Sequence, residues 1–200
     1  MKKNLVGMMV VAMAAITMDA SAQRIKLESG AVAVLAGEKE INTEFVYDGM
    51  SVGKFKTEAE YLAKKTEEYN KKETGKGDNW AKAWVADRQG RFEPVFNERF
   101  GLVSGLASGT APAAKYTMIV KTLSTEPGYN IGISRANSNI YLEVRIVETA
   151  DKSKEIAKIR VEKATGGSWV GYDFDTGQRI GEAYAEAGTA LGAYIKKNTK

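Results

Sequence analysis

The amino-acid sequence predicts an α+β fold, with three or four helices, one of them C-terminal, packed on one face of a mostly antiparallel sheet. Two patterns carry this prediction. Apolar and charged side chains alternate over residues 140–148 and again over 155–163, as in a hairpin with one buried and one wet face. Residues 178–197 instead repeat apolar side chains at the spacing of one helical face, which predicts a closing helix.

The first 22 residues have the three parts of a secretory signal peptide. Lys2 and Lys3 give the positive start, residues 5–18 are an apolar run, and small residues end at Ala22. The run is too short for a transmembrane helix, which needs roughly 20 apolar residues. A lipoprotein would carry a Cys after the small residues, and the chain has none. We expect cleavage between Ala22 and Gln23, and a mature chain that is periplasmic or secreted.

Residues 23–200 are expected to form a single domain, because a chain of this length can bury one core. Removing the signal peptide lowers the net charge from +4 to +3. Basic and acidic residues are interleaved along the chain rather than segregated, which argues against a nucleic-acid partner. No second apolar run reaches membrane-spanning length, so no transmembrane anchor is expected in the mature chain.

The mature chain opens with predicted strands and a turn. Residues 24–47 have strand character throughout: residues 31–36 are apolar, and residues 41–47 alternate. Glycines between these runs interrupt the strands, and the glycine-containing segment 48–53 predicts a turn.

A first helix is predicted to begin at Thr57. Thr57 and Glu60 form a capping box, in which the hydroxyl and the carboxylate accept hydrogen bonds from free backbone N–H groups. One face of this helix is expected to carry Tyr61, Leu62, Lys65 and Tyr69. The polar, glycine-bearing segment 71–77 is expected to be a loop.

Two further helices are predicted before residue 104. Asp78 or Asn79 is the expected N-cap of the second helix, and Gly90 its expected end. Pro94 fits the first turn of a third helix, where its missing N–H costs nothing. The glycine-rich and alanine-rich segment 104–114 is then expected to be a flexible crossing.

The second half is rich in predicted strands. Residues 116–123 are expected to form a central strand, and residues 129–133 a short strand after a Pro-Gly turn. After the hairpin of residues 140–163, the glycine-rich segment 164–177 bridges to the closing helix.

The absence of His and Cys excludes most enzyme chemistry. Ser-His-Asp and Cys-His catalysis are ruled out, together with ordinary zinc and iron–sulfur sites. Catalysis would have to use carboxylates, Lys, Tyr or Ser. We therefore expect a protein that is not an enzyme, and no cofactor.

Three partial motifs do not support a site. Ser51–Lys54 matches S-x-x-K, but the S-D-N and K-T-G elements that accompany it are missing. Asp173–Gly177 resembles half of a calcium loop, yet Gln178 and Tyr184 occupy the positions that require Gly and Glu. A turn with Asx hydrogen bonding fits this segment better. The glycines of residues 166–177 lack the G-K-[ST] ending of a phosphate-binding loop.

Aromatic residues offer one candidate ligand site. Trp80 and Trp84 are four residues apart and project from one helical face, with Tyr61 nearby in the sequence. Together they could stack on a sugar or an aromatic ligand. The alternative interpretation is that they anchor the helices to the sheet, since aromatic side chains dominate core burial.

The sequence resembles a group of small exported proteins of unknown function from anaerobic, gut-type bacteria of the Bacteroidetes kind. The residues that carry the resemblance are Gly37–Tyr47, Lys76–Trp80, Trp84, Phe92, Phe96 and Gly171–Ile180. The sheet with a final packed helix is also similar to the N-terminal domain of TolB and related envelope lipoproteins. The resemblance implies an envelope protein that works through contacts. The missing lipidated Cys departs from the lipoproteins and argues against outer-membrane anchoring.

Three functions remain open from the sequence. The first is a non-catalytic binding module for an envelope protein or polymer, which predicts an exposed apolar or aromatic patch. The second is a small-ligand carrier with a pocket lined by Trp80, Trp84 and Tyr61. The third is a carboxylate-based glycan hydrolase, which requires two acids facing each other roughly 5 to 10 Å apart.

Overall fold

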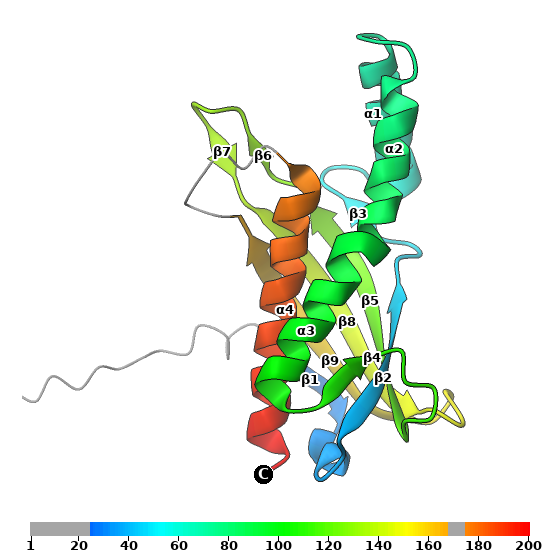
Figure 1. Cartoon of the computed structure of the whole chain (residues 1–200), viewed down its shortest axis with the longest axis vertical. Helices are drawn as coiled ribbons and strands as arrows, with labels where there is room; N and C mark the ends of the chain where they lie inside the picture. The colour runs from blue at the N-terminus through cyan, green and yellow to red at the C-terminus, as the bar shows by residue number, and fades with distance from the viewer. Residues whose placement is uncertain (1–24, 168–174) are drawn as a thin grey trace, which may run out of the picture.

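The computed structural model describes residues 25–167 and 175–200, and it has the predicted α+β fold (Figure 1). The expected cleavage site between Ala22 and Gln23 lies outside the described residues, as do Asp173 and Phe174 of the Asp173–Gly177 segment. The strands are β1 (Ile25–Gly30), β2 (Glu40–Val46), β3 (Ser51–Val52), β4 (Ala107–Gly109), β5 (Tyr116–Glu126), β6 (Tyr129–Asn130), β7 (Arg135–Ala136), β8 (Ser138–Glu148) and β9 (Glu155–Gly166). The helical elements are η2 (Val32–Leu35), α1 (Glu58–Asn70), α2 (Lys76–Asp87), η3 (Arg88–Phe92), α3 (Glu93–Ser104) and α4 (Thr176–Asn198).

Seven strands form one mixed sheet in the order β1-β9-β8-β5-β2-β4, with β3 paired to β5. The pairs β1–β9, β9–β8 and β8–β5 are antiparallel, whereas β2 pairs in parallel with both β4 and β5. The predicted β8–β9 hairpin is confirmed, with Val144 opposite Ile159 and Ile146 opposite Ala157. Strand β5 is central, as its apolar sequence predicts. Strands β6 and β7 form a separate two-stranded hairpin.

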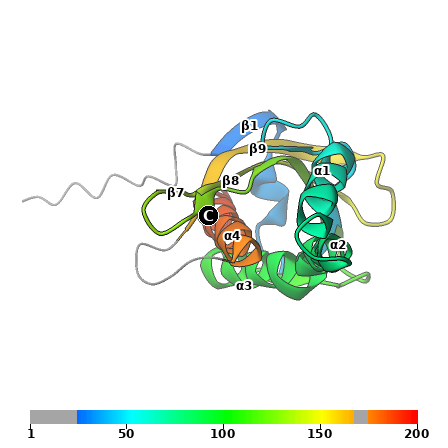
Figure 2. The ribbon, with the colours of Figure 1, turned by 90° about the horizontal axis from the view of Figure 1, so that it is seen from above.

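The helices lie on one face of the sheet, as expected (Figure 2). Helix α4 packs against β8 and β9 on one side and against α3 on the other. The side chains buried at this interface include Leu142, Val144, Ile159, Val161, Ile180, Tyr184 and Leu191. The alternation of the strands and the helical stripe of α4 therefore meet in one core.

Helices α3 and α4 approach closely because α4 presents glycines to α3. A Cβ on Gly188 would lie 2.5 Å from the Phe96 carbonyl oxygen, and one on Gly192 would lie 2.9 Å from that of Phe100. Both distances are far inside van der Waals contact. Only glycine therefore allows the two backbones to pack at this separation.

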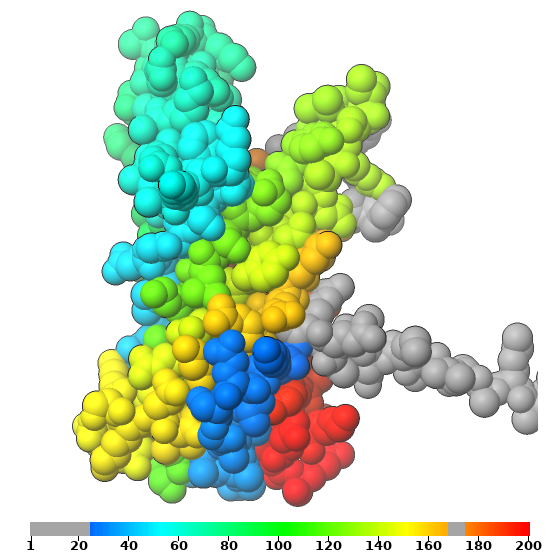
Figure 3. Space-filling view, turned by 180° about the vertical axis from the view of Figure 1, so that it is seen from behind, coloured from blue at the N-terminus to red at the C-terminus, as the bar shows by residue number. Residues whose placement is uncertain are grey.

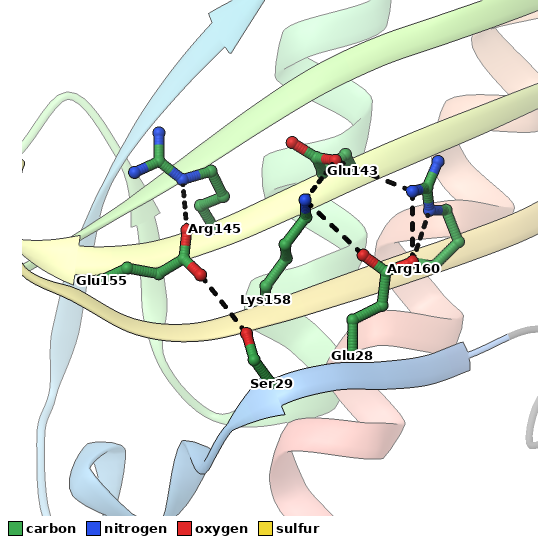
Figure 4. Close-up of polar contacts among 7 residues, drawn as sticks. All are labelled: Glu28, Ser29, Glu143, Arg145, Glu155, Lys158 and Arg160. Carbon is green, nitrogen blue, oxygen red and sulfur yellow. Dashed lines mark hydrogen bonds and ion pairs between the residues drawn. The ribbon is translucent and has the colours of Figure 1, made fainter.

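The other face of the sheet carries charged side chains in register (Figure 4). Glu143 on β8 lies 3.0 Å from the Lys158 ammonium and 3.7 Å from Arg160, both on β9. Glu28 on β1 pairs with the same two cations, at 3.7 Å from Lys158 and 3.1 Å from Arg160. Opposite charges on neighbouring strands stabilise a wet face, which is the role that the hairpin pattern predicts.

Two local predictions before residue 80 are wrong. The apolar segment 31–36 is not a strand but the 3-10 turn η2, in which Val32 and Leu35 lie three residues apart and are both buried on the same side. The second helix is not capped by Asp78 or Asn79. It begins at Lys76, after Gly75 in the left-handed conformation.

Gly90 does not end the second helix, which also corrects the prediction of a separate third helix. Residues 76–104 form one continuous helical run, because the π turn η3 joins α2 to α3. The Glu93 N–H donates to the Arg88 carbonyl, five residues back. A proline normally clashes with the carbonyl four residues before it, and the wider π turn relieves that clash at Pro94.

Two hairpins project from the same end of the sheet (Figure 1). The helical hairpin α1–α2 begins with the predicted cap, since the Thr57 hydroxyl accepts from the Glu60 N–H. Its two helices touch at Gly77, where a Cβ would lie 2.1 Å from the Thr66 carbonyl oxygen. The β6–β7 hairpin stands opposite. Within residues 25–167 and 175–200, no helix has the length and hydropathy to cross a membrane.

Candidate binding cleft

Five aromatic rings pack the helical hairpin onto the end of the sheet. The Tyr61 ring lies 5.7 Å from Phe55, 5.8 Å from Trp80 and 5.1 Å from Trp84, measured between centroids. Trp80 lies 5.7 Å from Trp84 and 5.5 Å from Tyr69. Tyr61 and Trp84 are buried, and Trp80 is half-buried. The structure therefore brings the three predicted site residues together, with their rings packed against one another.

Trp84 is also held by a polar contact. Its indole N–H donates to Glu58 Oε1 at 2.6 Å, and Arg88 Nη2 donates to both oxygens of the same carboxylate at 2.6 and 2.5 Å. The Arg88 guanidinium lies over the Tyr47 ring, 4.3 Å from its centroid. These contacts tie the start of α1 to the π turn, a position at which helices often carry functional residues.

Behind Trp84, the interior is closed. A cavity of about 10 Å³, lined by Trp84 and Tyr184 among others, has room for about one water molecule. Burial raises the pKa of Tyr184 and of Tyr47 far above neutrality, so both phenols stay protonated. The Tyr47 hydroxyl donates to Glu93, whose own pKa is raised by burial. This cluster has no space for a ligand, and its tyrosines do not ionise near neutral pH.

An open cleft of about 470 Å³ separates the two projecting hairpins. Figure 3 shows the hollow between them, with α1 on one side and the β6–β7 segment on the other. The residues that line it are Val52–Phe55, Tyr61, Lys65, Tyr69, Glu126–Ile131, Thr176 and Arg179. Of the predicted site residues, only Tyr61 is among these, and Trp80 and Trp84 stand behind it. The volume falls within the range of small-ligand sites.

The cleft lining carries more positive than negative charge. Lys54, Lys65 and Arg179 face a single carboxylate, Glu126. Lys65 is partly neutralised by Glu68, 3.0 Å away on the same helix. The Arg179 side chain is buried at the floor, where it donates to the Pro127 carbonyl and to Thr176. Within the described residues Lys54 forms no ion pair, and its ammonium lies 5.7 Å from the Phe55 centroid.

The β6–β7 hairpin exposes apolar side chains beside the cleft. Tyr129 is 47% exposed, Ile131 63% and Ile133 96%. These three residues occupy every second position from 129 to 133. The described residues contain eight exposed large apolar side chains, and three of them lie here. A cluster of this kind marks a contact surface more often than a scattered exposed residue does.

A second, shallower hollow of about 440 Å³ lies where the π turn meets the start of α4. Arg91 crosses it, paired with Asp175 at 2.6 Å and with Asp87 at 3.0 Å. Asp175 caps α4 by accepting from the Gly177 and Gln178 N–H groups, so the predicted Asx bonding is confirmed there. Burial opposes the charge of Asp175, but its hydrogen bonds from Arg91 and the backbone outweigh burial and lower its pKa. Arg91, Asp87 and Asp175 are therefore paired with one another in this hollow.

The described residues hold no cluster of acidic side chains of the kind that binds a metal ion. Within residues 25–167 and 175–200, no three Asp or Glu side chains gather to hold a metal ion. The cleft lining offers one carboxylate, whereas glycoside hydrolysis needs two that face each other.

No family model matches the sequence, and no curated protein matches it significantly. Among solved structures, the chain is similar to a chain of the PelC dodecamer from Paraburkholderia phytofirmans, with 12% identity and a TM-score of 0.41 over 84% of this chain and 96% of that chain. A methionine variant of the same dodecamer gives 12% identity and a TM-score of 0.39, covering 84% of this chain and 97% of that one. A likeness this weak assigns neither an activity nor a partner to this chain.

Sequence reasoning missed most of the cleft. Lys54, Tyr129 and Arg179 lie in three distant segments, and no spacing rule relates them. A signal was present in residues 129–133, which alternate apolar and polar side chains within a glycine-rich segment. In the structure that alternation forms a projecting hairpin and not a strand of the main sheet.

Proposed function

We propose that this chain is an exported, non-catalytic binding module that contacts an envelope protein, in the periplasm or outside the cell. The main observation in support is the apolar surface of the β6–β7 hairpin, where Tyr129, Ile131 and Ile133 are exposed. Covering such side chains with a partner removes them from water, at roughly 25 cal/mol for each Å² buried. The export signal, and the absence of His and Cys from the sequence, also support a role that depends on contacts.

Photo-crosslinking tests the contact surface. With a photoreactive amino acid at Ile133, irradiation of the cells that make the protein is expected to give one discrete protein adduct, because this side chain would lie in the interface. The control position is Leu102, which is 68% exposed on α3, far from the hairpin in sequence. The same pattern of adducts at both positions, or no adduct at Ile133, would contradict the proposal.

Export is tested by the mass and location of the mature chain. We expect the purified protein to begin at Gln23 and to be recovered outside the cytoplasm. Replacing Ala22 with Arg places a large charged residue where the peptidase reads a small one, so the uncleaved precursor should accumulate. Substitution of Gln23 by Glu is the control and should leave cleavage intact. A full-length chain in the cytoplasm would refute export.

A small-ligand carrier is the second candidate function, and the 470 Å³ cleft favours it. Its pocket would be bounded by Tyr61, Tyr69 and Tyr129, and Trp80 and Trp84 would support the pocket wall from behind. A carboxylate-based hydrolase gains no support from this cleft, whose lining holds only Glu126 as an acid.

A further inference from the structure

The cleft between the two hairpins presents aromatic rings on both walls. Tyr61 and Tyr69 line it from α1, and Tyr129 lines it from β6. The α1 rings are fixed in place because Trp80 packs behind both, 5.8 Å from Tyr61 and 5.5 Å from Tyr69. A ligand meeting preset rings loses less side-chain entropy than one that must order them. Flat rings and pyranose faces stack on such surfaces.

The Tyr129 ring is also held in place, although it is half exposed. Its hydroxyl hydrogen-bonds to the Ser134 hydroxyl at 3.1 Å, across the turn of the hairpin. A wall of fixed rings on α1 therefore faces a tethered ring on β6. The cleft volume of about 470 Å³ is large enough for a ligand with one or a few rings.

The charge at the mouth of this cleft is positive. Lys54 is exposed and has no ion-pair partner among the described residues, so its ammonium is available to a ligand. Lys65 shares its charge with Glu68. The buried Arg179 adds a positive charge at the floor, and Glu126 is the one carboxylate among the described residues that line the cleft. Buried and partly buried charges of this kind attract anions over short range.

We propose that the cleft binds a ligand that carries a ring next to an anionic group. The ring lies between the tyrosines of α1 and Tyr129, and the carboxylate, sulfate or phosphate lies at Lys54. An acidic sugar and an aromatic acid share this chemistry. The cleft shares Tyr129 and Ile131 with the proposed protein contact, but Ile133 does not line it, so the experiments at Ile133 and at Lys54 test the two proposals separately.

Calorimetry on the mature chain tests the ligand class with three probes: trigalacturonate, 2-naphthoate and the neutral maltotriose. We expect at least one of the two anions to bind with a millimolar or tighter Kd, at least tenfold tighter than maltotriose. Lys54→Gln should weaken that binding about five- to tenfold, as expected for one charge-assisted hydrogen bond. Tyr129→Ala should weaken it about threefold to tenfold through lost stacking.

Matched controls separate these effects from general disturbance. Lys56→Gln removes an exposed ammonium two residues away, outside the cleft lining, and Tyr141→Ala removes an exposed ring from the outer face of the sheet. Both controls should bind the anion as the unmodified chain does.

Trigalacturonate binding alone identifies an acidic sugar, and 2-naphthoate binding alone identifies an aromatic acid. Absence of binding by both anions, equal binding of maltotriose, or equal losses in Lys54→Gln and Lys56→Gln overturn the inference. Loss of the Ile133 adduct alone overturns only the protein contact.

Discussion

Replacing Gly188 with Ala is expected to lower the free energy of unfolding by about 2 kcal/mol. The added Cβ would lie 2.5 Å from the Phe96 carbonyl oxygen and 3.2 Å from the Phe100 nitrogen, both backbone atoms of α3. The helices must separate to admit it, at a cost of about 3 kcal/mol for overpacking. The better helix propensity of alanine returns about 1 kcal/mol. Urea unfolding, followed by tryptophan fluorescence, measures the difference.

Gly181 on the same helix supplies the control. A Cβ there would meet its nearest neighbour, Phe92, at 3.9 Å, which is ordinary contact. Gly181→Ala should therefore stabilise the protein by up to about 1 kcal/mol through propensity alone. Opposite signs for the two substitutions are the expected result. Stabilisation by both would mean that α3 and α4 are not in close backbone contact at Gly188.

Removing the Glu58 carboxylate is expected to cost about 2 to 3 kcal/mol of stability. Glu58→Ala leaves the Arg88 charge and the Trp84 N–H without their acceptor, where both members of the ion pair are 19% exposed. Losing one partner of a largely buried pair costs several kcal/mol because the other stays desolvated, and the remaining exposure reduces that figure. Glu58→Gln retains an acceptor for the Trp84 N–H, so its free energy of unfolding should lie between those of the unmodified chain and Glu58→Ala. Chemical denaturation of the unmodified chain and the two variants measures these free energies of unfolding.

The control for Glu58 is a surface pair on the same helix. Glu67 lies 2.5 Å from Lys71, but both side chains are more than half exposed, so water screens this i,i+4 pair and it contributes little to stability. Glu67→Ala should therefore be nearly neutral. Equal effects at the two positions would show that the Glu58 contact contributes no more than an ordinary surface ion pair.

The parts of the fold that follow local periodicity could be predicted from the sequence. The alternation over residues 140–148 and 155–163 indicates which side chains face the core, because a slip of one residue would turn every side chain to the other face. The helical stripe of residues 178–197 works in the same way, and α4 extends only slightly beyond it. Thr57 likewise marks the start of α1, since its cap depends on neighbours three residues away.

The predicted break between the second and third helices is wrong because tertiary packing outweighs the local helix breakers. Gly90 and Pro94 both disfavour a continuous helix, yet the π turn Arg88–Phe92, which contains Gly90 and precedes Pro94, keeps the helical run unbroken from Lys76 to Ser104. The packing of Phe92 and Phe96 in the core stabilises this arrangement, and no local rule contains that information.

The cleft could not be predicted because it is a property of three-dimensional assembly. The sequence correctly grouped Tyr61, Trp80 and Trp84, which lie on adjoining helices. The opposite wall comes from residues some sixty positions later, carried there by the order of strands β5, β6 and β7. Residue spacing along a helix predicts which side chains are neighbours on that helix. Which segment forms the opposite wall of the cleft depends on the topology of the whole fold.

The continuous helix from Lys76 to Ser104 also makes the two walls of the cleft mechanically unequal. Its α3 half packs against α4 through close backbone contacts, and its α2 half carries Trp80, which packs behind the tyrosines of α1. The ring wall is therefore backed by a helix that is anchored in the core. The facing wall is a hairpin of two-residue strands. The α1 wall is therefore the stiffer of the two. The more compliant wall is the β6–β7 hairpin, which bears the exposed Ile131 and Ile133.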